Sequence, residues 1–150
     1  GIDMLGVAPE QRRIGRLFQD DLLFPHLAVM ENLLFGMPRG ERGTREALAL
    51  AALESAGIGD LATRMPHTLS GGQRSRVALL RALLAEPLAI LLDEPFAKLD
   101  IPLRQSVRDY VYSSLAAKGV PALLVTHDAA DVPADGRVFR IDASGTVTHV

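Results

Sequence analysis

The sequence predicts an α/β fold in which a mainly parallel sheet is combined with an inserted helical segment. Two apolar runs, LAILLDEP at 88–95 and VPALLVTHD at 120–128, are continuous rather than alternating, which is typical of parallel strands covered on both faces. A helical stretch at 100–119 separates them, and strand, helix and strand in this order form the unit of a parallel sheet. Residues 20–85, by contrast, contain helical patterns and no strand signal.

The first element along the chain is expected to be a short strand at 12–19, RRIGRLFQ, because its apolar residues suit an extended chain. A short helical turn is expected at 29–35. The segment TREALALAALESAG at 44–57 predicts a longer helix, with Thr44 as its N-cap and Gly57 at its C-terminal stop position.

The next helix is expected at about 71–85, within LSGGQRSRVALLRALLAEP, and Ser70 is its predicted N-cap because a serine hydroxyl accepts a hydrogen bond from a free first-turn amide. For the helix at 100–119, Asp100 is the expected cap and Gly119 the expected end. The segments RVFRID and TVTHV around ASG then predict a hairpin at the end of the sequence.

The composition indicates a soluble globular protein. The chain has 150 residues, of which 48% are hydrophobic and 23% charged, and this length suits one domain. It contains no cysteine, which excludes disulfides and thiolate metal sites. The net charge is −2 and the arginines are scattered, so nucleic acid is not an expected partner. No apolar run approaches the roughly 18 residues of a membrane span.

The two glycines that follow Ser70 need a reason of their own, since glycine is a poor helix former and one cap is already present. Gly71 and Gly72 leave the backbone amides uncovered, so that a ligand can approach them closely. Exposed amides at a helix N-terminus attract phosphate. The stretch is therefore a candidate anion site, although a capped loop without a ligand explains Ser-Gly-Gly alone equally well.

Polar residues follow each of the three expected strands at its carboxyl end, where open parallel sheets bind their ligands. Asp93 is suited to hold Mg²⁺ through water, and Glu94 to orient or deprotonate a water molecule. His127 is placed to contact a phosphate oxygen, and Gln19 to touch the metal or the water. Taken singly, each of these residues also fits a surface or capping role.

Together these stretches resemble the ATPase subunits of ABC transporters. LSGGQRSRVALLRALLAEPLAILLDEPFAKLD resembles their signature-to-D-loop segment, RRIGRLFQDDLLFPHLAVMENLLFG their Q-loop region, and LLVTHD their switch-histidine strand. Within the family the sequence is similar to bacterial importer-type subunits, such as those for thiamine, polyamines or molybdate. The resemblance implies a partial P-loop NTPase fold, with 1–19 and 86–150 in the ATPase core and 20–85 as the helical subdomain that ends in the signature helix.

The resemblance also implies the cofactors ATP and Mg²⁺ in a complete family member, with no tight binding expected from these residues alone. It gives each residue at the sheet edge a role. Asp93 would be the Walker B magnesium residue, Glu94 the general base and His127 the switch histidine. Gln19 would be the Q-loop glutamine, which contacts the metal.

Five further residues would belong to the interface between two ATPase subunits. By resemblance, Ser70, Gly71, Gly72 and Gln73 form the signature, which presses on the γ-phosphate of ATP held by the opposite subunit. Asp100 falls at the D-loop aspartate, which signals between the subunits. The implied partners are a second ATPase subunit and a transmembrane permease, the latter through the region from Asp20 to Leu34. The implied location is cytoplasmic, on the inner face of the cell membrane.

A phosphate-binding loop of the pattern G-x-x-x-x-G-K-[ST] does not occur in the sequence. In the family this loop precedes the Q-loop glutamine. We therefore expect the sequence to be the C-terminal portion of an ATPase subunit, which hydrolyses ATP as a whole protein and not as these residues alone.

The alternative is a non-catalytic interaction module that docks on a membrane permease without turning over nucleotide. DNA-repair and chromosome-maintenance ATPases share the signature, but they place a long coiled coil between the two halves of the site. The sequence has no heptad region between Gln19 and Ser70, which argues against that class.

Overall fold

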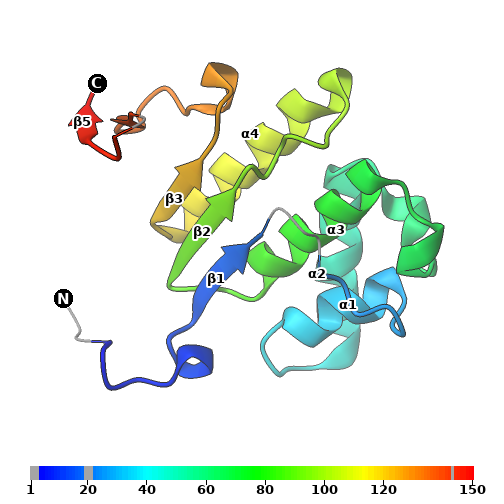
Figure 1. Ribbon diagram of the computed structural model, residues 1–150. Coiled ribbons are helices and arrows are strands. Elements are labelled where there is room, and N and C mark those ends of the chain that lie inside the picture. The colour runs from blue at the N-terminus through cyan, green and yellow to red at the C-terminus, as the bar shows by residue number, and fades with distance from the viewer. Residues whose placement is uncertain (1–3, 19–21, 143) are drawn as a thin grey trace.

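The computed structural model describes residues 4–18, 22–142 and 144–150 (Figure 1). Three parallel strands form one sheet in the order β1 (Ile14–Leu17), β2 (Ala89–Asp93) and β3 (Ala122–Val125). In its register Leu17 lies opposite Leu92, and Asp93 lies opposite Val125. The prediction that these strands share one parallel sheet is confirmed, and their carboxyl ends meet at one edge. Gln19, which follows β1, lies outside the described residues.

The remaining elements also follow the predicted order. The longer helices are α1 (Val29–Gly36), α2 (Arg42–Ser55), α3 (Gly71–Leu84) and α4 (Ile101–Lys118). Short 3-10 turns are η1 (Pro9–Gln11), η2 (Gly59–Leu61), η3 (Pro66–Thr68) and η4 (Ala129–Asp131). The predicted hairpin is present as β4 (Phe139–Ile141) and β5 (Val147–His149), which pair antiparallel. The α/β fold class is confirmed. Among the described helices, none combines the length and apolarity that crossing a membrane requires.

The start of α3 is fixed by a reciprocal cap. The Ser70 hydroxyl accepts a hydrogen bond from the Gln73 amide at 3.2 Å, and the Gln73 side chain accepts one from the Ser70 amide at 2.8 Å. This capping box satisfies two amides that a helix start leaves unpaired. The prediction of Ser70 as N-cap is confirmed, and the side chain of Gln73 is engaged within its own helix.

Two other predicted caps need correction. Helix α2 starts at Arg42, and Glu41 rather than Thr44 caps it, because the Glu41 carboxylate accepts from the amides of Gly43 and Thr44. Asp100 does occupy the N-cap position of α4, but its side chain makes no capping hydrogen bond to the described helix. The predicted C-terminal ends of these two helices, at Gly57 and Gly119, are confirmed.

Gly57 and Gly119, the two residues at those stops, follow α2 and α4 with φ of +66° and +61°. Glycine adopts this left-handed conformation without the steric cost of a side chain.

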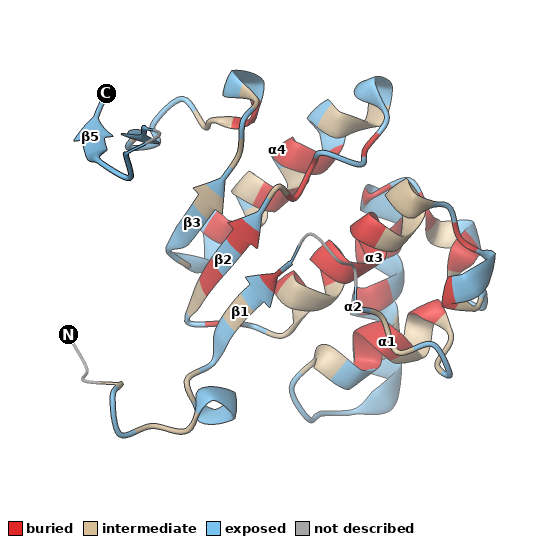
Figure 2. Cartoon of the chain, viewed as in Figure 1, coloured by how far each residue is buried: buried red, intermediate tan, exposed pale blue. Residues whose placement is uncertain are grey.

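Two clusters of buried apolar side chains share helix α3. Figure 2 shows buried residues along α3 and on β2. One face of α3 packs Leu79 and Leu83 against the sheet and α4. Another face packs Val77 and Leu80 against α1 and α2. Since α3 is held on both sides, the position of its N-terminus relative to the sheet is fixed. The division of the chain at 19/20 and 85/86 stays a prediction, because α3 belongs to both clusters.

The expectation that the central strands are covered on both faces is wrong for the described chain. Ile90 and Leu92 of β2 are buried against α3 and α4. On the opposite face Leu91 is 38% exposed, and Leu123 and Val125 of β3 are 59% and 55% exposed. Both strands have the continuous apolar run on which the expectation was based. Among the described elements, however, the helices pack on only one face of the sheet. Asp93 also stands on the uncovered face, since it alternates with Leu92.

Candidate active site

The strand β2 delivers Asp93 and Glu94 to the carboxyl edge of the sheet. Asp93 is its last residue and is exposed. Glu94 follows with φ of +49°, a left-handed conformation that is costly for a residue with a side chain. Its amide donates to the carbonyl oxygen of Val125 at 2.9 Å, which holds this turn against β3. Backbone held in such a conformation gathers at functional sites, where the surroundings offset its cost.

The two carboxylate oxygens of Glu94 have different environments. Oε1 accepts a hydrogen bond from the His127 amide at 3.1 Å and lies 2.7 Å from His127 Nδ1. Oε2 is buried and has no hydrogen-bond partner among the described residues. A buried carboxylate oxygen without a partner is costly and calls for a group that fills the site in use. One oxygen is thus anchored, and the other keeps lone pairs that no described group satisfies.

His127 stands two residues beyond β3, with a side chain that is 79% exposed. The hydrogen bond to Glu94, together with the negative charge of that carboxylate, raises the pKa of His127 above its ordinary value, and Asp128 and Asp131 contribute in the same direction. Because the contact uses Nδ1, Nε2 is the ring nitrogen available to a ligand. The pair stabilises the fold fully below the unfolded-state pKa, and this contribution is lost as the pH rises through the folded-state pKa.

In the Glu94→Gln variant the pKa of His127 is expected to fall toward the ordinary histidine value. The substitution keeps the shape of the side chain but removes the charge that favours the imidazolium. An NMR titration of the His127 ring protons in wild type and variant measures the change, with the signals of the other histidines as internal reference. A His127 titration that is identical in both proteins would show that the contact does not form in solution.

The start of α3 lies against the segment that follows Glu94. A Cβ at Gly72 would stand only 2.8 Å from the backbone oxygen of Lys98, whereas the nearest neighbour of a Cβ at Gly71 is an arginine side-chain atom at 3.9 Å. Gly72 is therefore required by packing between two backbone segments, a reason that the sequence did not reveal. Gly71 has no such close neighbour, and the expectation of an uncovered amide there stays a prediction.

Gly72→Ala is expected to destabilise the fold by about 1–3 kcal/mol, because the added methyl group meets main chain that can only move as a unit. Gly71→Ala is the matched control, one residue away on the same helix and free of a close neighbour. Urea unfolding of both variants measures the difference. Equal unfolding midpoints for the two alanine variants would contradict the packing role of Gly72.

Asp100 is exposed at the start of α4, where its carbonyl oxygen accepts hydrogen bonds from the amides of Leu103 and Arg104 at 3.0 Å each. Its charge also reaches helix α3. Burial lowers the pKa of Arg76 on α3, and Asp100 opposes this shift. The segment between Glu94 and Asp100 thus connects the sheet edge with both helices.

The predicted site residues fall into two groups. Asp93, Glu94 and His127 meet at the sheet edge, with Glu94 and His127 in direct contact. Ser70 to Gln73 lie at the start of α3, and no hydrogen bond among the described residues joins Ser70 or Gln73 to Glu94 or His127. Within the described part of the chain, no three histidine or carboxylate side chains gather into a metal cluster. Asp93 nevertheless offers the oxygen donor that Mg²⁺ prefers. Phosphate and water oxygens commonly complete the coordination shell of this ion.

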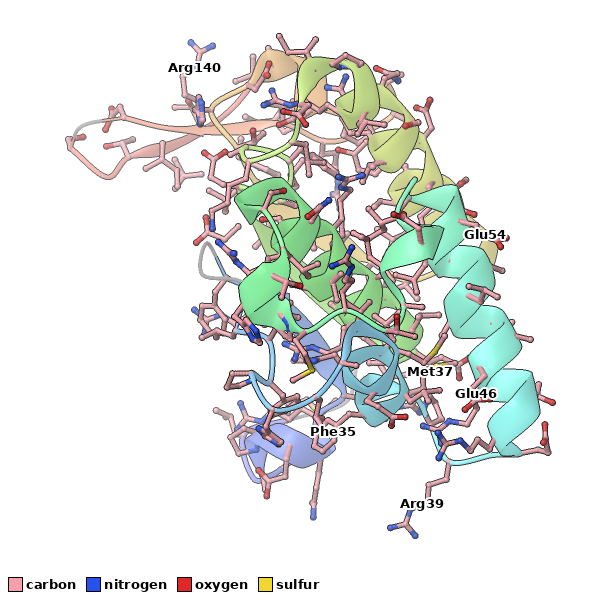
Figure 3. All side chains as sticks on the ribbon, turned by 90° about the vertical axis from the view of Figure 1, so that its right-hand side faces the viewer. Phe35, Met37, Arg39, Glu46, Glu54 and Arg140 are labelled. Atoms are coloured by element: carbon pink, nitrogen blue, oxygen red, sulfur yellow. The ribbon has the colours of Figure 1, made fainter. Side chains whose placement is uncertain are left out.

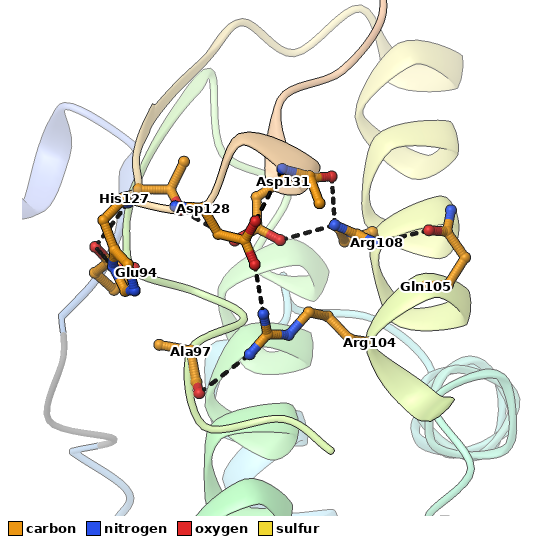
Figure 4. Close-up of polar contacts among 10 residues, drawn as sticks. Glu94, Ala97, Arg104, Gln105, Arg108, His127, Asp128 and Asp131 are labelled. Atoms are coloured by element: carbon orange, nitrogen blue, oxygen red, sulfur yellow. Dashed lines mark hydrogen bonds and ion pairs between the residues drawn. The ribbon is translucent and has the colours of Figure 1, made fainter. Parts of the chain in front are cut away.

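A buried polar network beside this edge was missed by sequence reasoning (Figure 4). Arg108 of α4 forms an ion pair with Asp131 at 2.9 Å, and both residues are buried. Thr126 donates to the other Asp131 oxygen at 3.0 Å, and the Tyr112 hydroxyl donates to the Asp131 carbonyl. Burial, followed by the charge of Asp131, raises the pKa of Tyr112 to about 12.

The sequence did carry a signal for this network. Arg104, Arg108 and Tyr112 recur at intervals of four residues and so share one face of the predicted helix, opposite the acidic turn after β3.

The fold and the sheet edge define a class of α/β proteins that bind ligands beyond the carboxyl ends of parallel strands. Within this class, the sequence profile of the family described as ABC transporter matches residues 2–97. The chain therefore belongs to the ABC transporter family.

Relatives and solved structures agree with this assignment. The chain is 51% identical over 139 residues to the uncharacterized ABC transporter ATP-binding protein YnjD of Escherichia coli K12, covering 92% of this chain and 63% of that protein. It is 41% identical over 166 residues to the molybdenum import ATP-binding protein ModC of Granulibacter bethesdensis, covering 100% and 44% respectively. A dimeric post-hydrolysis structure of the ATP-binding cassette MJ0796 with ADP and Pi superimposes with a TM-score of 0.71 at 34% identity, covering 81% and 56%. The chain thus spans less than two thirds of the length of these proteins.

Proposed function

We propose that the chain is part of an ATP-binding and ATP-hydrolysing subunit, which energises substrate transport across a bacterial inner membrane. The observation that carries this proposal is the Glu94 carboxylate, with Oε1 held by His127 and Oε2 buried without a partner among the described residues. A general base needs this combination of a fixed orientation and a free lone pair.

Each residue at the sheet edge has a different role in the proposed hydrolysis. Glu94 Oε2 orients a water molecule and accepts its proton, while His127 fixes the carboxylate through Oε1. The pKa of His127 is raised by Glu94, so the ring also carries positive charge over a wider pH range and can face phosphate oxygens through Nε2. Asp93 would hold Mg²⁺ through its exposed carboxylate. When bound, Mg-ATP supplies the γ-phosphate that the water attacks.

The signature residues Ser70, Gly71, Gly72 and Gln73 are proposed to act on ATP bound by a second subunit. The start of α3 supports this role, because a Cβ at Gly71 would have its nearest neighbour 3.9 Å away and the dipole of a 14-residue helix favours an anion at its N-terminus. The names of the relatives support the importer assignment, since they describe import of molybdenum and of Fe(3+) ions. We place the subunit on the cytoplasmic face of the membrane.

A hollow of about 350 Å³ supports docking on a permease. It lies between β1, α1 and α3 and is lined by aromatic side chains, of which Phe18 is 40% exposed and Phe35 68% exposed. The Arg16 guanidinium stands 4.0 Å over the Phe18 ring, and that of Arg81 5.2 Å over Phe24.

Figure 3 shows Phe35 at the outer end of α1, on the side of the N-terminal segment. Exposed aromatics around a groove suit the apolar face of an amphipathic helix. Within the predicted permease-facing region, the described residues Leu22 and Phe24 line this hollow.

The function is tested by phosphate release from Mg-ATP by the whole protein, alone and in vesicles with its permease. We expect turnover in both cases. Phe35→Asp is expected to keep the turnover of the protein alone and to lose retention on the vesicles. Leu48→Asp, an exposed apolar residue of α2 away from the hollow, is the matched control and should be retained. If the wild-type protein is retained on the vesicles but does not hydrolyse Mg-ATP, the hydrolase proposal is overturned in favour of the interaction module. If the Phe35→Asp variant hydrolyses Mg-ATP and is still retained on the vesicles, the proposed docking site is overturned.

A further inference from the structure

We propose that Arg104 is a positioning residue, which clamps together the two loops that carry Glu94 and His127. The proposal rests on the proposed function, because it concerns the geometry of the same catalytic pair. It assigns to α4 a direct part in holding the site.

One guanidinium group reaches both loops (Figure 4). Arg104 Nη1 forms an ion pair with Asp128 Oδ2 at 2.7 Å, and Asp128 directly follows His127. Arg104 Nη2 donates to the carbonyl oxygen of Ala97 at 3.4 Å. Ala97 belongs to the turn that begins at Glu94, where its amide donates to the Glu94 carbonyl at 3.3 Å. The planar guanidinium therefore sets the distance between the two loops on the side away from the Glu94–His127 contact.

Asp128 is itself held in place, so the clamp has a rigid end. Its amide donates to the Thr126 hydroxyl at 3.0 Å, and its Oδ1 accepts from the Ala130 amide at 2.9 Å. This backbone hydrogen bond lowers the pKa of Asp128, and Arg104 lowers it further, so the carboxylate is ionised at neutral pH. The side chains of Arg104 and Asp128 are 22% and 35% exposed, which shields their ion pair from solvent more than a surface pair.

The clamp differs from the neighbouring pair between Arg108 and Asp131. That pair is more deeply buried and joins α4 to the turn after β3 alone, so it accounts for stability. Arg104 adds the contact to Ala97, on the loop after β2. The Nε of Arg104 is buried without a partner among the described residues, a cost that its two Nη contacts offset. We therefore expect Arg104 to matter more for the geometry of the site than for folding.

The first test compares Arg104→Gln with Arg104→Lys in the whole protein. Arg104→Gln is expected to lower kcat about tenfold with an unchanged KM for Mg-ATP, since the clamp affects the water-activating pair and not nucleotide contacts. Arg104→Lys should recover part of kcat, because an ammonium group restores the charge at Asp128 but cannot bridge both loops. In a His127→Ala background the Arg104→Gln effect should shrink, as expected for a residue that acts through His127. Full additivity of the two substitutions would overturn the proposal.

The second test needs no hydrolysis and uses amide hydrogen exchange in the chain itself. The His127 amide donates to Glu94 Oε1, so its exchange rate reports the contact. Arg104→Gln is expected to accelerate this exchange about tenfold and to leave the amides of β2 unchanged, whereas general destabilisation would accelerate both. Arg42→Gln, which removes exposed ion pairs on α2, is the control. Unchanged His127 exchange in both Arg104 variants would overturn the clamp. A wild-type whole protein without turnover would instead overturn the proposed function and leave this test to decide the role of Arg104.

Discussion

Glu94→Gln in the whole protein is expected to lower the turnover of Mg-ATP by about 10²- to 10⁴-fold, the usual contribution of a general base. The amide keeps an oxygen that accepts from the His127 backbone, so the turn after β2 should keep its shape. It presents no basic atom at the position of Oε2, which is the buried oxygen without a partner among the described residues. Nucleotide affinity should stay nearly unchanged. Steady-state phosphate release and calorimetric binding of Mg-ATP measure the two quantities separately.

The matched control for this substitution is Glu86→Gln, the same change at an exposed residue that pairs only loosely with Lys118 at 3.7 Å. Its turnover should equal that of wild type. Near-normal hydrolysis by Glu94→Gln would show that the base is a different residue. A variant that fails to bind Mg-ATP would show that Glu94 holds the nucleotide rather than the water.

Asp131→Ala is expected to destabilise the chain by about 3–5 kcal/mol, the range observed when one partner of a buried ion pair is removed. Asp131 is 1% exposed and Arg108 8% exposed, so the substitution leaves a cation among buried groups. It also removes the oxygen that accepts from Thr126, two residues before Asp128. Urea unfolding followed by circular dichroism measures the loss.

Asp135→Ala, an exposed aspartate in the next loop, is the control and should change stability by no more than about 0.5 kcal/mol. A second variant separates the net contribution of the ion pair from the cost of leaving one buried charge unpaired. Replacing Arg108 and Asp131 together by methionine and leucine should recover much of the stability, since a buried pair is costly to desolvate. An Asp131→Ala chain as stable as the control would show that the pair does not form in solution.

The sequence predicted those features that depend on short segments. Continuous apolar runs identified β2 and β3, and Ser70 with a helical pattern behind it identified the start of α3. The parallel order of strands then placed Asp93, Glu94 and His127 at one edge, because carboxyl ends of parallel strands meet there.

Features that depend on packing between distant segments could not be predicted in the same way. Glu41 and Thr44 both precede an alanine- and leucine-rich run, and only the path of the chain decides that Glu41 is the cap. The need for glycine at Gly72 arises from the backbone of Lys98, which is 26 positions away in the sequence. Which faces of the sheet are covered also depends on other segments, because the apolarity of a strand does not tell which elements pack on it.

The most direct test of the account is a crystal structure of the whole protein with Mg²⁺ and a non-hydrolysable ATP analogue. We expect a water molecule within hydrogen-bond distance of Glu94 Oε2, facing the γ-phosphate, with His127 still in contact with Oε1. Asp93 should lie next to the metal shell. A structure in which a protein donor occupies Oε2, and the water next to the γ-phosphate is held by another residue, would contradict the assignment of Glu94 as the base.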